Sequence, residues 1–471
     1  MKKKTRIVCT IGPASESKEM MKSLLLAGMN IARLNFSHGN HEEHYARMVT
    51  AREISKETGK TLSILLDTKG PEIRLGVFKN DKEEFKKGDI VKVCKEEIEG
   101  TKERFHIACP ELFDDVTPND FILINDGKQK LTVLENDGSE LTCRVEVNGP
   151  ISSRKGCNVP GVKLSMPFIS SKDDDDLRFG CQNDVDFIAA SFVRRADDVL
   201  AIRKILIEEG KPKIGIIAKI ENQEGFDNLE SILEVADGVM VARGDLGVEV
   251  ETAFVPIYQK RIIKVANILG KPVITATHML DSMTDNPRCT RAEASDVANA
   301  VLDGSDGVML SAESAAGDYP LEAVKTMSMI CESAEGIIQY KDKLKVSKRS
   351  SNRSIQDAIG ISISDAALNL DIRAIVVFTQ GGTTARRISK FRPCVPILAV
   401  TFSHRVERAL NAYWGVKPIF SGIQNEMTND DELASEIAKA NGFLPGQLII
   451  ISAGYPTGEG SANMMKIVKI K

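Results

Sequence analysis

Residues 214–222 (IGIIAKIEN) and 237–245 (DGVMVARGD) show the pattern that decides the fold of this chain: a short apolar run that ends in polar or glycine residues. Continuous apolar runs of this length are typical of strands buried on both faces, as in a parallel sheet. Segments with helical periodicity, such as SKEMMKSLLLAGM (17–29), lie between most of the runs. Eight alternations of strand and helix predict a (β/α)₈ TIM barrel. The eight runs begin near residues 6, 30, 62, 185, 214, 237, 272 and 306.

The third and fourth runs are separated by far more than the ~30 residues of one βαβ unit. The interval contains short strand-like segments such as FILINDG (121–127), and its Asp126-Gly127 and Asp137-Gly138 pairs are turn dipeptides. We therefore expect an inserted all-β domain. A basic, serine-rich stretch at 341–354 suggests a linker, after which strand and helix patterns restart as an α/β domain with an open sheet. The expected boundaries are 1–70 and 168–342 for the barrel, 71–167 for the insertion and 343–471 for the third domain.

Composition excludes several classes of protein. The net charge is −4 and there is one Trp, so nothing favours a nucleic-acid surface. No apolar run approaches the ~20 residues of a membrane span, and Gly12-Pro13 interrupts the apolar stretch near the start, which argues against a signal peptide. The nine cysteines form no CxxC pair, which is typical of reduced thiols. We expect a cytoplasmic protein that binds neither nucleic acid nor membranes.

Polar and charged side chains follow most of the eight apolar runs. In such a barrel, active sites form at the carboxyl ends of the strands. Lys219 and Glu221 share one face of a strand because they lie two residues apart, and Asp245 follows the next run. One such Lys–Glu pair alone is more often an ordinary salt bridge. Further candidates at these ends are Arg33, Asn35, Ser37, His38, Asp67, Lys69, Glu72, Arg74, Asn222, Arg243, Gly244, Thr277, His278, Ser311 and Glu313.

The residue types at these ends point to a class of chemistry. Two carboxylates with open water positions suit Mg²⁺, which keeps several waters and takes substrate oxygens. Arginine and lysine suit phosphate groups. The pattern therefore predicts a barrel enzyme that uses a divalent metal on a phosphorylated or carboxylated small molecule, and it contains the parts needed for phosphoryl transfer.

Five ordered stretches make the chain resemble one family over essentially its whole length. They are RLNFSHG (33–39), LDTKGPEIR (66–74), KIENQEG (219–225), MVARGDLGVE (240–249) and NPRCTRAEASDVANAVLDG (286–304). The chain resembles pyruvate kinase, whose barrel carries an inserted β-domain and a C-terminal α/β domain. The resemblance implies transfer of the phosphoryl group of phosphoenolpyruvate to ADP, giving pyruvate and ATP in glycolysis. It also implies Mg²⁺ or Mn²⁺, K⁺, a homotetramer and an inserted domain that acts as a lid.

Two alternatives remain open from the residues. One is another metal-dependent barrel enzyme acting on phosphoenolpyruvate or an oxo acid, such as a lyase, which would not need a nucleotide lid. The other is a metabolite sensor that lost turnover. The sensor reading would be favoured by loss of Lys219, Glu221 or Asp245, and all three are present.

The resemblance assigns catalytic and substrate-binding roles. Lys219 would lie against the transferring phosphoryl group, which Arg33 would also contact. Glu221 and Asp245 would hold Mg²⁺. Amides near Gly244, with Thr277 beside them, would take the substrate carboxylate. The implied catalytic residues are Lys219, Thr277, Arg33 and Ser311, and the last would act with Thr277 to order the water that protonates the enolate.

The resemblance also implies sites for K⁺ and nucleotide. Asn35, Ser37, Asp67 and Thr68 would bind K⁺, and Glu72 is the residue type of K⁺-dependent members. The residues implied in nucleotide binding are Arg33, Asn35, His38, Arg74 and, from the inserted domain, Lys155. Four positions depart from the family pattern, namely His278, Cys289, Ala312 and Ala316, but none removes a metal or phosphate group, so we expect activity.

The stretch TQGGTTARR (379–387) lies between a predicted strand and a predicted helix. By pattern alone it is an ordinary turn, although its glycines and threonines also suit a phosphate. The resemblance implies an effector phosphate site that includes Thr379, Gly381, Gly382, Thr383 and Thr384, with the loop at 454–463 closing over it. The effector stays open between fructose 1,6-bisphosphate, AMP and a pentose phosphate, and Glu459 is an unfavourable charge for any of them.

Overall fold

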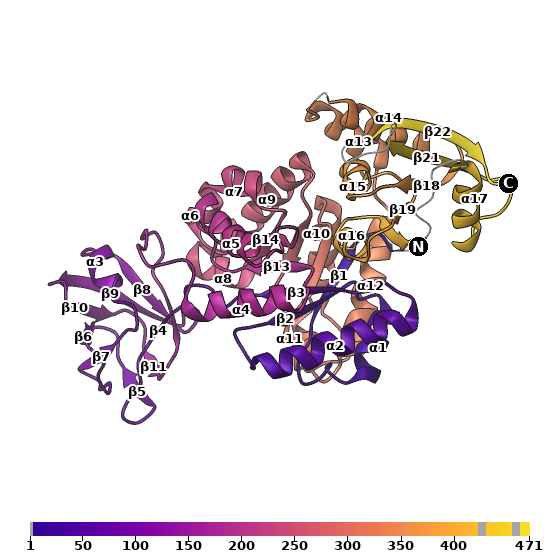
Figure 1. The fold of residues 1–471 in the computed structure, drawn as a ribbon. Helices are drawn as coiled ribbons and strands as arrows, with labels where there is room; N and C mark the ends of the chain where they lie inside the picture. Colours follow the sequence, from indigo (N-terminus) through magenta and orange to yellow (C-terminus); the bar gives the residue numbers. More distant parts are fainter. Residues whose placement is uncertain (1–2, 353, 423–429, 455–461) are drawn as a thin grey trace.

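The computed structural model describes residues 3–352, 354–422, 430–454 and 462–471. Its centre is a closed barrel of eight parallel strands in the order β1-β17-β16-β15-β14-β13-β3-β2, which confirms the predicted barrel (Figure 1). Each strand falls within one of the eight apolar runs. The strands are β1 (Arg6–Thr10), β2 (Ile31–Asn35), β3 (Ser63–Asp67), β13 (Phe187–Ala190), β14 (Gly215–Ile220), β15 (Gly238–Ala242), β16 (Val273–Ala276) and β17 (Gly307–Leu310).

Helices surround the barrel and bury the outward faces of its strands. Alternate strand residues such as Ile64 and Ile216 pack outward in one apolar core with the helices, whereas Leu65 and Ile217 belong to a second core inside the barrel. The barrel helices are α1 (Lys18–Ala27), α2 (His41–Thr58), α4 (Ser171–Gln182), α5 (Ala196–Glu208), α6 (Gln223–Asp227), α7 (Leu229–Val235), α8 (Arg243–Glu249), η1 (Thr252–Phe254), α9 (Val255–Leu269), η2 (Asp281–Thr284), α10 (Arg291–Asp303), α11 (Ala312–Ala315) and α12 (Pro320–Glu335).

The insertion after β3 is built almost entirely of strands around its own apolar core, and it projects from one end of the molecule (Figure 1). A seven-stranded sheet has the order β4-β12-β8-β9-β10-β6-β7, and β11 pairs with β5. Its one short helix is α3 (Leu112–Asp115). The strands are β4 (Ile73–Arg74), β5 (Lys82–Phe85), β6 (Ile90–Cys94), β7 (Arg104–His106), β8 (Phe121–Ile124), β9 (Gln129–Asn136), β10 (Glu140–Val145), β11 (Gly149–Ser152) and β12 (Gly156–Asn158).

The C-terminal part carries an open five-stranded sheet in the order β20-β19-β18-β21-β22, with β22 antiparallel to β21. The stretch at 341–354, expected as a linker or domain boundary, is largely helical and not an open linker: α13 spans Tyr340–Arg349 and buries Leu344. The strands are β18 (Ile372–Phe378), β19 (Ile397–Thr401), β20 (Val416–Phe420), β21 (Leu448–Gly454) and β22 (Ala462–Lys469), and the remaining helices are α14 (Ile355–Asn369), α15 (Thr383–Lys390), α16 (His404–Leu410) and α17 (Asp430–Ala440).

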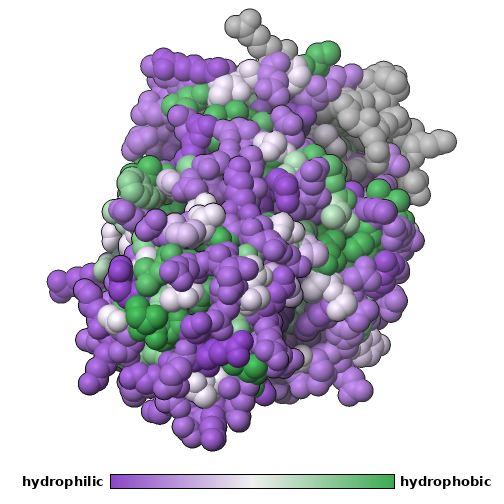
Figure 2. All heavy atoms as spheres, turned by 90° about the vertical axis from the view of Figure 1, so that its left-hand side faces the viewer, coloured by the Kyte–Doolittle hydropathy of each residue, from purple (hydrophilic) through white to green (hydrophobic). Residues whose placement is uncertain are grey.

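The surface seen from the side of the inserted domain is largely hydrophilic, with apolar patches between the polar side chains (Figure 2). Within the described ranges, every helix is too short or too polar to cross a bilayer.

The amino ends of the barrel strands face the C-terminal domain, and Asp306 joins the two. Asp306 lies just before β17 and is buried. Its Oδ2 accepts hydrogen bonds from Nη2 of Arg392 at 2.9 Å and from the Val273 amide at 3.1 Å, and its Oδ1 accepts from the Trp414 amide at 3.1 Å. The apolar core inside the barrel also continues into this domain, so the two parts fold as neighbours with a shared interior.

We predict that Asp306→Asn loosens this junction. The substitution leaves the buried guanidinium of Arg392 without its charge partner, and breaking a buried pair typically costs about 3–5 kcal/mol. The urea midpoint reported by emission of the single Trp should therefore fall clearly. Asp303→Asn is the matched control. Asp303 pairs with the exposed Lys260, so the loss of this pair should lower the free energy of unfolding by less than about 1 kcal/mol. Equal midpoints for the two variants would contradict the prediction.

Candidate active site at the carboxyl ends of the barrel strands

The inward-facing positions of the barrel change from apolar to polar at the carboxyl ends of the strands. Side chains alternate with a period of two along a strand. The residues two positions beyond Ile31, Leu65 and Ile217 of the interior core are therefore inward-facing as well, and they are Arg33, Asp67 and Lys219. The same step from Val8, Ala189 and Met309 gives Thr10, Ser191 and Ser311. The fold thus collects these side chains in one layer.

Asp67 is the centre of this layer and is fully buried. Its Oδ2 accepts a hydrogen bond from Nε of Arg33 at 2.6 Å. Its Oδ1 accepts from Nζ of Lys219 and from Oγ of Ser191, each at 3.1 Å. Burial alone would raise the pKa of Asp67, but the charges of Arg33 and Lys219 outweigh burial and hold the pKa below its usual value. The carboxylate is therefore ionised and fixes two cations.

Lys219 lies between two carboxylates. Its Nζ is 3.1 Å from Oδ1 of Asp67 and 3.0 Å from Oε1 of Glu221, and it donates to Oγ of Ser191 at 2.7 Å. Burial favours the neutral amine, but Asp67 and Glu221 outweigh burial and raise the pKa of Lys219 above its ordinary value. This ammonium group therefore stays charged.

Glu221 is fully buried and is held from two sides. Its Oε2 accepts from the Phe192 amide at 2.6 Å, and Phe192 takes a left-handed φ of 55° to present that amide. Its Oε1 forms the ion pair with Nζ of Lys219 at 3.0 Å and accepts from no other donor among the described residues. Burial raises the pKa of Glu221 to about 7, against the charge of Lys219 and with a further contribution from Asp245.

Glu221 and Asp245 suit a hard divalent cation. Asp245 stands in the first turn of α8, half-buried, and its charge acts on both Glu221 and Lys219. Among the described residues, no three His, Cys, Asp or Glu side chains gather closely enough to hold a metal by themselves. Two neighbouring carboxylates, one of which has a buried oxygen paired only with Lys219, fit Mg²⁺, which completes its shell with water and substrate oxygens.

Thr277 and His278 occupy a strained turn after β16. Their φ angles are +63° and +53°, a region that is unfavourable for side-chain-bearing residues and especially for a β-branched one. Arg243 holds the turn: its Nη2 donates to the Thr277 carbonyl at 2.7 Å, and its Nη1 lies 2.6 Å from Oδ2 of Asp296. As a result the Thr277 hydroxyl accepts from the Gly244 amide at 2.7 Å. The His278 side chain is exposed.

The residues implied in K⁺ binding end β2 and β3, which pair along the barrel. Oδ1 of Asn35 accepts from the Ser37 amide at 3.2 Å. The Thr68 carbonyl accepts from Oγ of Ser191 at 2.6 Å. Asp67 is already paired with two cations, so a bound K⁺ would share its carboxylate with them.

The residues implied in nucleotide binding come from the barrel and from the inserted domain. His38 is exposed on the loop after β2. Arg74 and Lys155 lie in the inserted domain. Arg74 is the last residue of β4; it pairs with Glu72 at 2.5 Å and donates a hydrogen bond to the Arg154 carbonyl at 2.8 Å. Lys155 directly precedes β12. Arg74 follows the third barrel strand in sequence, and as expected from the boundary at residue 71 it lies in the sheet of the insertion, where β4 pairs with β12.

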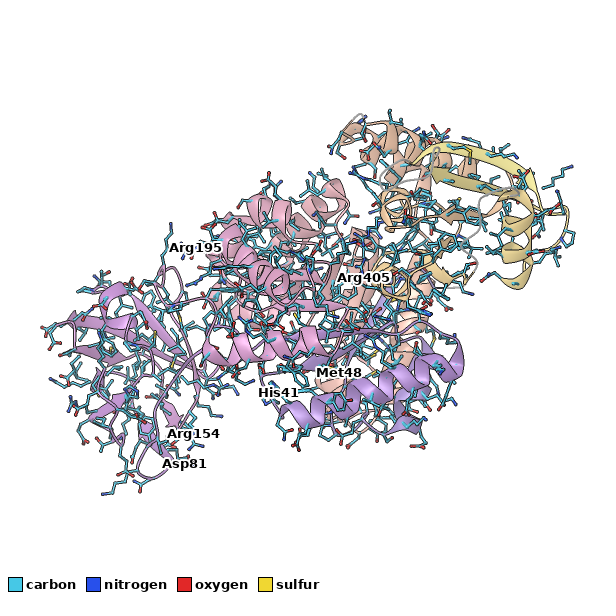
Figure 3. All side chains as sticks on the ribbon, viewed as in Figure 1. His41, Met48, Asp81, Arg154, Arg195 and Arg405 are labelled. Atoms are coloured by element: carbon cyan, nitrogen blue, oxygen red, sulfur yellow. The ribbon has the colours of Figure 1, made fainter. Side chains whose placement is uncertain are left out.

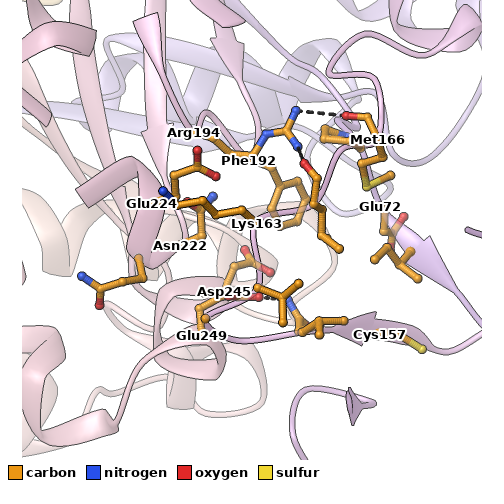
Figure 4. A pocket seen from close by; sticks show the side chains of 18 of the residues that line it. Glu72, Cys157, Lys163, Met166, Phe192, Arg194, Asn222, Glu224, Asp245 and Glu249 are labelled. Atoms are coloured by element: carbon orange, nitrogen blue, oxygen red, sulfur yellow. Dashed lines mark hydrogen bonds between the residues drawn. The ribbon is translucent and has the colours of Figure 1, made fainter. Parts of the chain in front are cut away.

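A cleft of about 260 Å³ separates the inserted domain from the barrel (Figure 4). Glu72 and Cys157 line it on the inserted side, and Asn222, Asp245 and Glu249 line it on the barrel side. Few direct bonds cross it. Nδ2 of Asn158 donates to Oε1 of Glu249 at 2.8 Å, and Nη1 of Arg194 donates to the Leu164 carbonyl at 2.8 Å.

Sequence reasoning missed Ser191, the Phe192 amide and Thr10. Ser191 bridges Lys219 and Asp67, and Oγ1 of Thr10 accepts from Nη1 of Arg33 at 2.8 Å. The fourth apolar run, VDFIAASFV, ends at Ser191, and the first passes through Thr10. Treating all eight ends alike would have found both side chains, but a backbone amide leaves no trace in the sequence.

The predicted effector loop joins β18 to α15. Gly382 caps α15 with φ of 84°, and its amide donates to Oγ1 of Thr379 at 3.0 Å. Thr384 is buried in the first turn of the helix. The part of the proposed closing loop at 455–461, including Glu459, lies outside the described residues.

Comparison with known proteins gives consistent matches. A family model described as the barrel domain of pyruvate kinase matches residues 2–324, and one described as its alpha/beta domain matches residues 357–468. A pyruvate kinase of Staphylococcus epidermidis is 54% identical, and one of Staphylococcus aureus 53%, over 99% of this chain and 80% of the relative. The crystal structure of a pyruvate kinase from Cryptosporidium parvum has a TM-score of 0.95 at 38% identity, covering 100% of this chain and 97% of that one.

We predict that Arg243→Lys lowers kcat by about 100-fold. Lysine keeps the charge but lacks the planar guanidinium that holds the strained turn. A displacement of about 1 Å in a group positioned for catalysis typically lowers the rate by about 100-fold. Steady-state kinetics measure the effect. Arg261→Lys, the same change at an exposed pair with Glu230, should keep wild-type kcat. If the two variants behave alike, Arg243 does not position Thr277.

We also predict that Glu221→Gln stabilises the metal-free protein at high pH. The pKa of Glu221 in the folded state is raised from 4.5 to about 7. The free energy of unfolding therefore begins to fall once the pH exceeds 4.5, where the carboxyl ionises in the unfolded chain, and it falls no further above about pH 7. Below pH 4.5 the carboxyl is protonated in both states and the cost vanishes. The Tm of the variant should exceed that of the wild type by a few degrees at pH 8 and match it near pH 4.5.

Scanning calorimetry in a chelating buffer tests this, with the exposed Glu234→Gln as control. Addition of Mg²⁺ should raise the Tm of the wild type and leave that of Glu221→Gln unchanged. A wild type more stable than the variant at pH 8 without metal would reverse the sign and overturn the prediction.

Proposed function

This chain belongs to the pyruvate kinase family, and we propose that the layer around Lys219 carries the transfer of the phosphoryl group from phosphoenolpyruvate to ADP. The family is glycolytic and its members are phosphotransferases, so the substrates are phosphoenolpyruvate and ADP and the products pyruvate and ATP. The alternative of a lyase finds no support among the relatives. The observation that carries the proposal is one charged ammonium held between Asp67 and Glu221 at the carboxyl ends of the strands.

Lys219 and Arg33 are proposed to bind the transferring phosphoryl group. Phosphoryl transfer passes through a loose transition state whose charge is spread over the equatorial oxygens, so fixed cations supply much of the catalysis. Lys219 is buried and stays charged, and Arg33 is held by Asp67 and Thr10. Neither cation needs to reorganise when the substrate arrives.

Glu221 and Asp245 are proposed to hold the Mg²⁺ (or Mn²⁺). When bound, the metal supplies charge neutralisation at the phosphoryl oxygens and at the enolate. Glu221 would contribute Oε1, which faces Lys219 in the ligand-free protein, and its other oxygen would keep the Phe192 amide. The raised pKa of Glu221 means that the metal competes with a proton near neutral pH.

Gly244, Thr277 and Ser311 are proposed to handle the carboxylate and proton ends of the substrate. The Gly244 amide would exchange its bond with Thr277 for the substrate carboxylate. Oγ of Ser311 is buried and has no partner within the described residues, so it can hold a water for protonation of the enolate together with Thr277.

K⁺ and nucleotide are proposed to bind on either side of this layer. Asn35, Ser37, Asp67 and Thr68 would hold K⁺, and His38, Arg74 and Lys155, together with Arg33 and Asn35, would face the nucleotide. The inserted domain would close the cleft as a lid, since few bonds cross it, and exclude water. We further propose a cytoplasmic homotetramer whose effector binds at Thr379, Gly381, Gly382, Thr383 and Thr384.

The decisive experiment is a coupled assay for pyruvate formation from phosphoenolpyruvate and ADP with Mg²⁺ and K⁺. Lys219→Met keeps the shape of the side chain but removes its charge, so kcat should fall at least 1000-fold. Lys264→Met, on the exposed side of α9, should keep full activity. The Tm increase with Mg²⁺ should persist in Lys219→Met, which shows that the metal site survives. A variant with more than a tenth of wild-type kcat would refute the proposed role.

A further inference from the structure

Four consecutive aspartates stand in the first turns of α4, and two of them are buried. Asp173 and Asp176 are 3% and 1% exposed, whereas Asp175 is exposed and Asp174 forms an ion pair within the helix. Residues three apart lie on the same face of a helix. A carboxylate is almost never buried without a partner, so the contacts of Asp173 and Asp176 show what this face of α4 holds.

Asp176 holds the loop that follows β2 at two points. Its Oδ2 accepts from Nζ of Lys172 at 2.6 Å, and the same Nζ donates to the Phe36 carbonyl at 3.0 Å. Its Oδ1 lies 2.7 Å from Nε2 of His41, the first residue of α2, which is labelled in Figure 3. The His41 ring also stacks on Phe179 of α4, with the ring centroids 4.2 Å apart. The segment 36–41 is therefore attached to α4 at both of its ends.

His44 supports the middle of the same loop. It is buried, and its ring stacks on that of Phe36 with the centroids 4.0 Å apart. Its Nε2 donates to the His38 carbonyl at 2.9 Å. The carbonyls of the residues on both sides of Ser37 thus accept a hydrogen bond from a side chain, which restricts the backbone that carries Ser37.

Asp173 holds the loop that follows β3. Its Oδ1 accepts from the Gly70 amide at 3.0 Å, and its Oδ2 accepts from Oγ of Ser170, the N-cap of α4, at 2.6 Å. Gly70 has a φ of +73°, and a Cβ at this position would lie 2.9 Å from the side chain of Ser191. The chain just beyond Thr68 is therefore closely packed and fixed to α4, so this helix connects the loops after both strands.

These two loops and the strand ends before them carry the four residues proposed to bind K⁺. Asn35 and Asp67 are register partners in β2 and β3, and Ser37 and Thr68 lie just beyond the two strands. The atoms that they offer are amide, carboxylate, hydroxyl and carbonyl oxygens. Oxygen atoms are the ligands that replace the hydration shell of K⁺ in proteins, so the residues present suit this ion.

From these contacts we propose that Lys172 and Asp176 are positioning residues for the K⁺ site, an inference that rests on the proposed function. Neither is one of the proposed ligands. Asp173 fixes α4 relative to Thr68, and the Lys172–Asp176 pair fixes the loop with Ser37 relative to α4. The spacing between the two sets of oxygens is then set before the ion arrives. Without the pair, the ion itself would have to order the loop, which weakens its binding.

The test follows hydrogen–deuterium exchange of the full chain in KCl and in tetramethylammonium chloride of equal ionic strength, without substrates. We expect K⁺ to slow exchange in 35–41 and 67–70 of the wild type. The K⁺ concentration for half of this protection should rise about tenfold or more in Lys172→Met and Asp176→Asn, as is typical when groups that orient metal ligands are removed. Lys172→Arg, which keeps the charge and a donor, should recover most of the affinity.

Asp175→Asn is the matched control, because Asp175 is exposed on the same helix, and it should shift the half-protection concentration by less than about twofold. In the coupled assay, the K⁺ concentration for half-maximal rate should shift in parallel with the exchange measurement. The kcat at saturating K⁺ should fall far less than the affinity for K⁺, because the loaded site is unchanged.

A merely structural role predicts a Tm that falls equally in both salts while the half-protection concentration stays at the wild-type value, and this result would overturn the inference. Equal K⁺ responses of Asp176→Asn and Asp175→Asn would overturn it as well. If Asp176→Asn fails to fold, Lys172→Met still decides, since Lys172 is half-exposed. If K⁺ protects neither loop of the wild type, the K⁺ site and this inference fail together, whereas phosphoryl transfer at Lys219 is judged separately by the Lys219→Met assay.

Discussion

The buried carboxylate of Asp67 is the interaction on which the rest of the site depends. It pairs with both Arg33 and Lys219, whose side chains are each only 11% exposed, and burying either cation without a partner would be strongly unfavourable. Glu221 provides a second partner for Lys219. In the ligand-free protein the two cations, Arg33 and Lys219, are matched by the two carboxylates, Asp67 and Glu221. A phosphate group and a divalent metal that bind together would add an anion and a cation to these existing ion pairs.

Two features of the site oppose folding. Glu221 is a fully buried carboxyl whose burial disfavours its charged form, and Thr277 and His278 hold left-handed backbone angles. Hydrogen bonds from surrounding groups hold both features in place. The Phe192 amide donates to Glu221, and the guanidinium of Arg243 donates to the Thr277 carbonyl in the strained turn. Unfavourable geometry of this kind concentrates where groups are positioned in advance for a reaction. Stability elsewhere in the barrel, from its two apolar cores, compensates for it.

The two additional domains meet the barrel in different ways. The inserted domain contacts the carboxyl side across a polar cleft with few direct bonds, which is compatible with movement. The C-terminal domain shares an apolar core and the buried Asp306 with the amino side, so it is bound tightly. The α16 helix lies at this tight junction and also packs against Gly382. A change at the predicted effector loop would therefore have a direct physical route to the strand starts.

The barrel could be predicted from the sequence, because eight short apolar runs alternate with helical patterns and so favour strands of a parallel sheet, and the same runs place Lys219, Glu221 and Asp67 at or next to the strand ends. The partners of these side chains could not be predicted. Ser191, Thr10 and the Phe192 amide come from separate strands and loops, and closure of the barrel brings them together. The helix at 340–349 likewise depended on packing. The spacing of apolar residues along a helix or strand indicates which of its faces is buried. It does not indicate which other element packs against that face, because this depends on contacts between residues far apart in the chain.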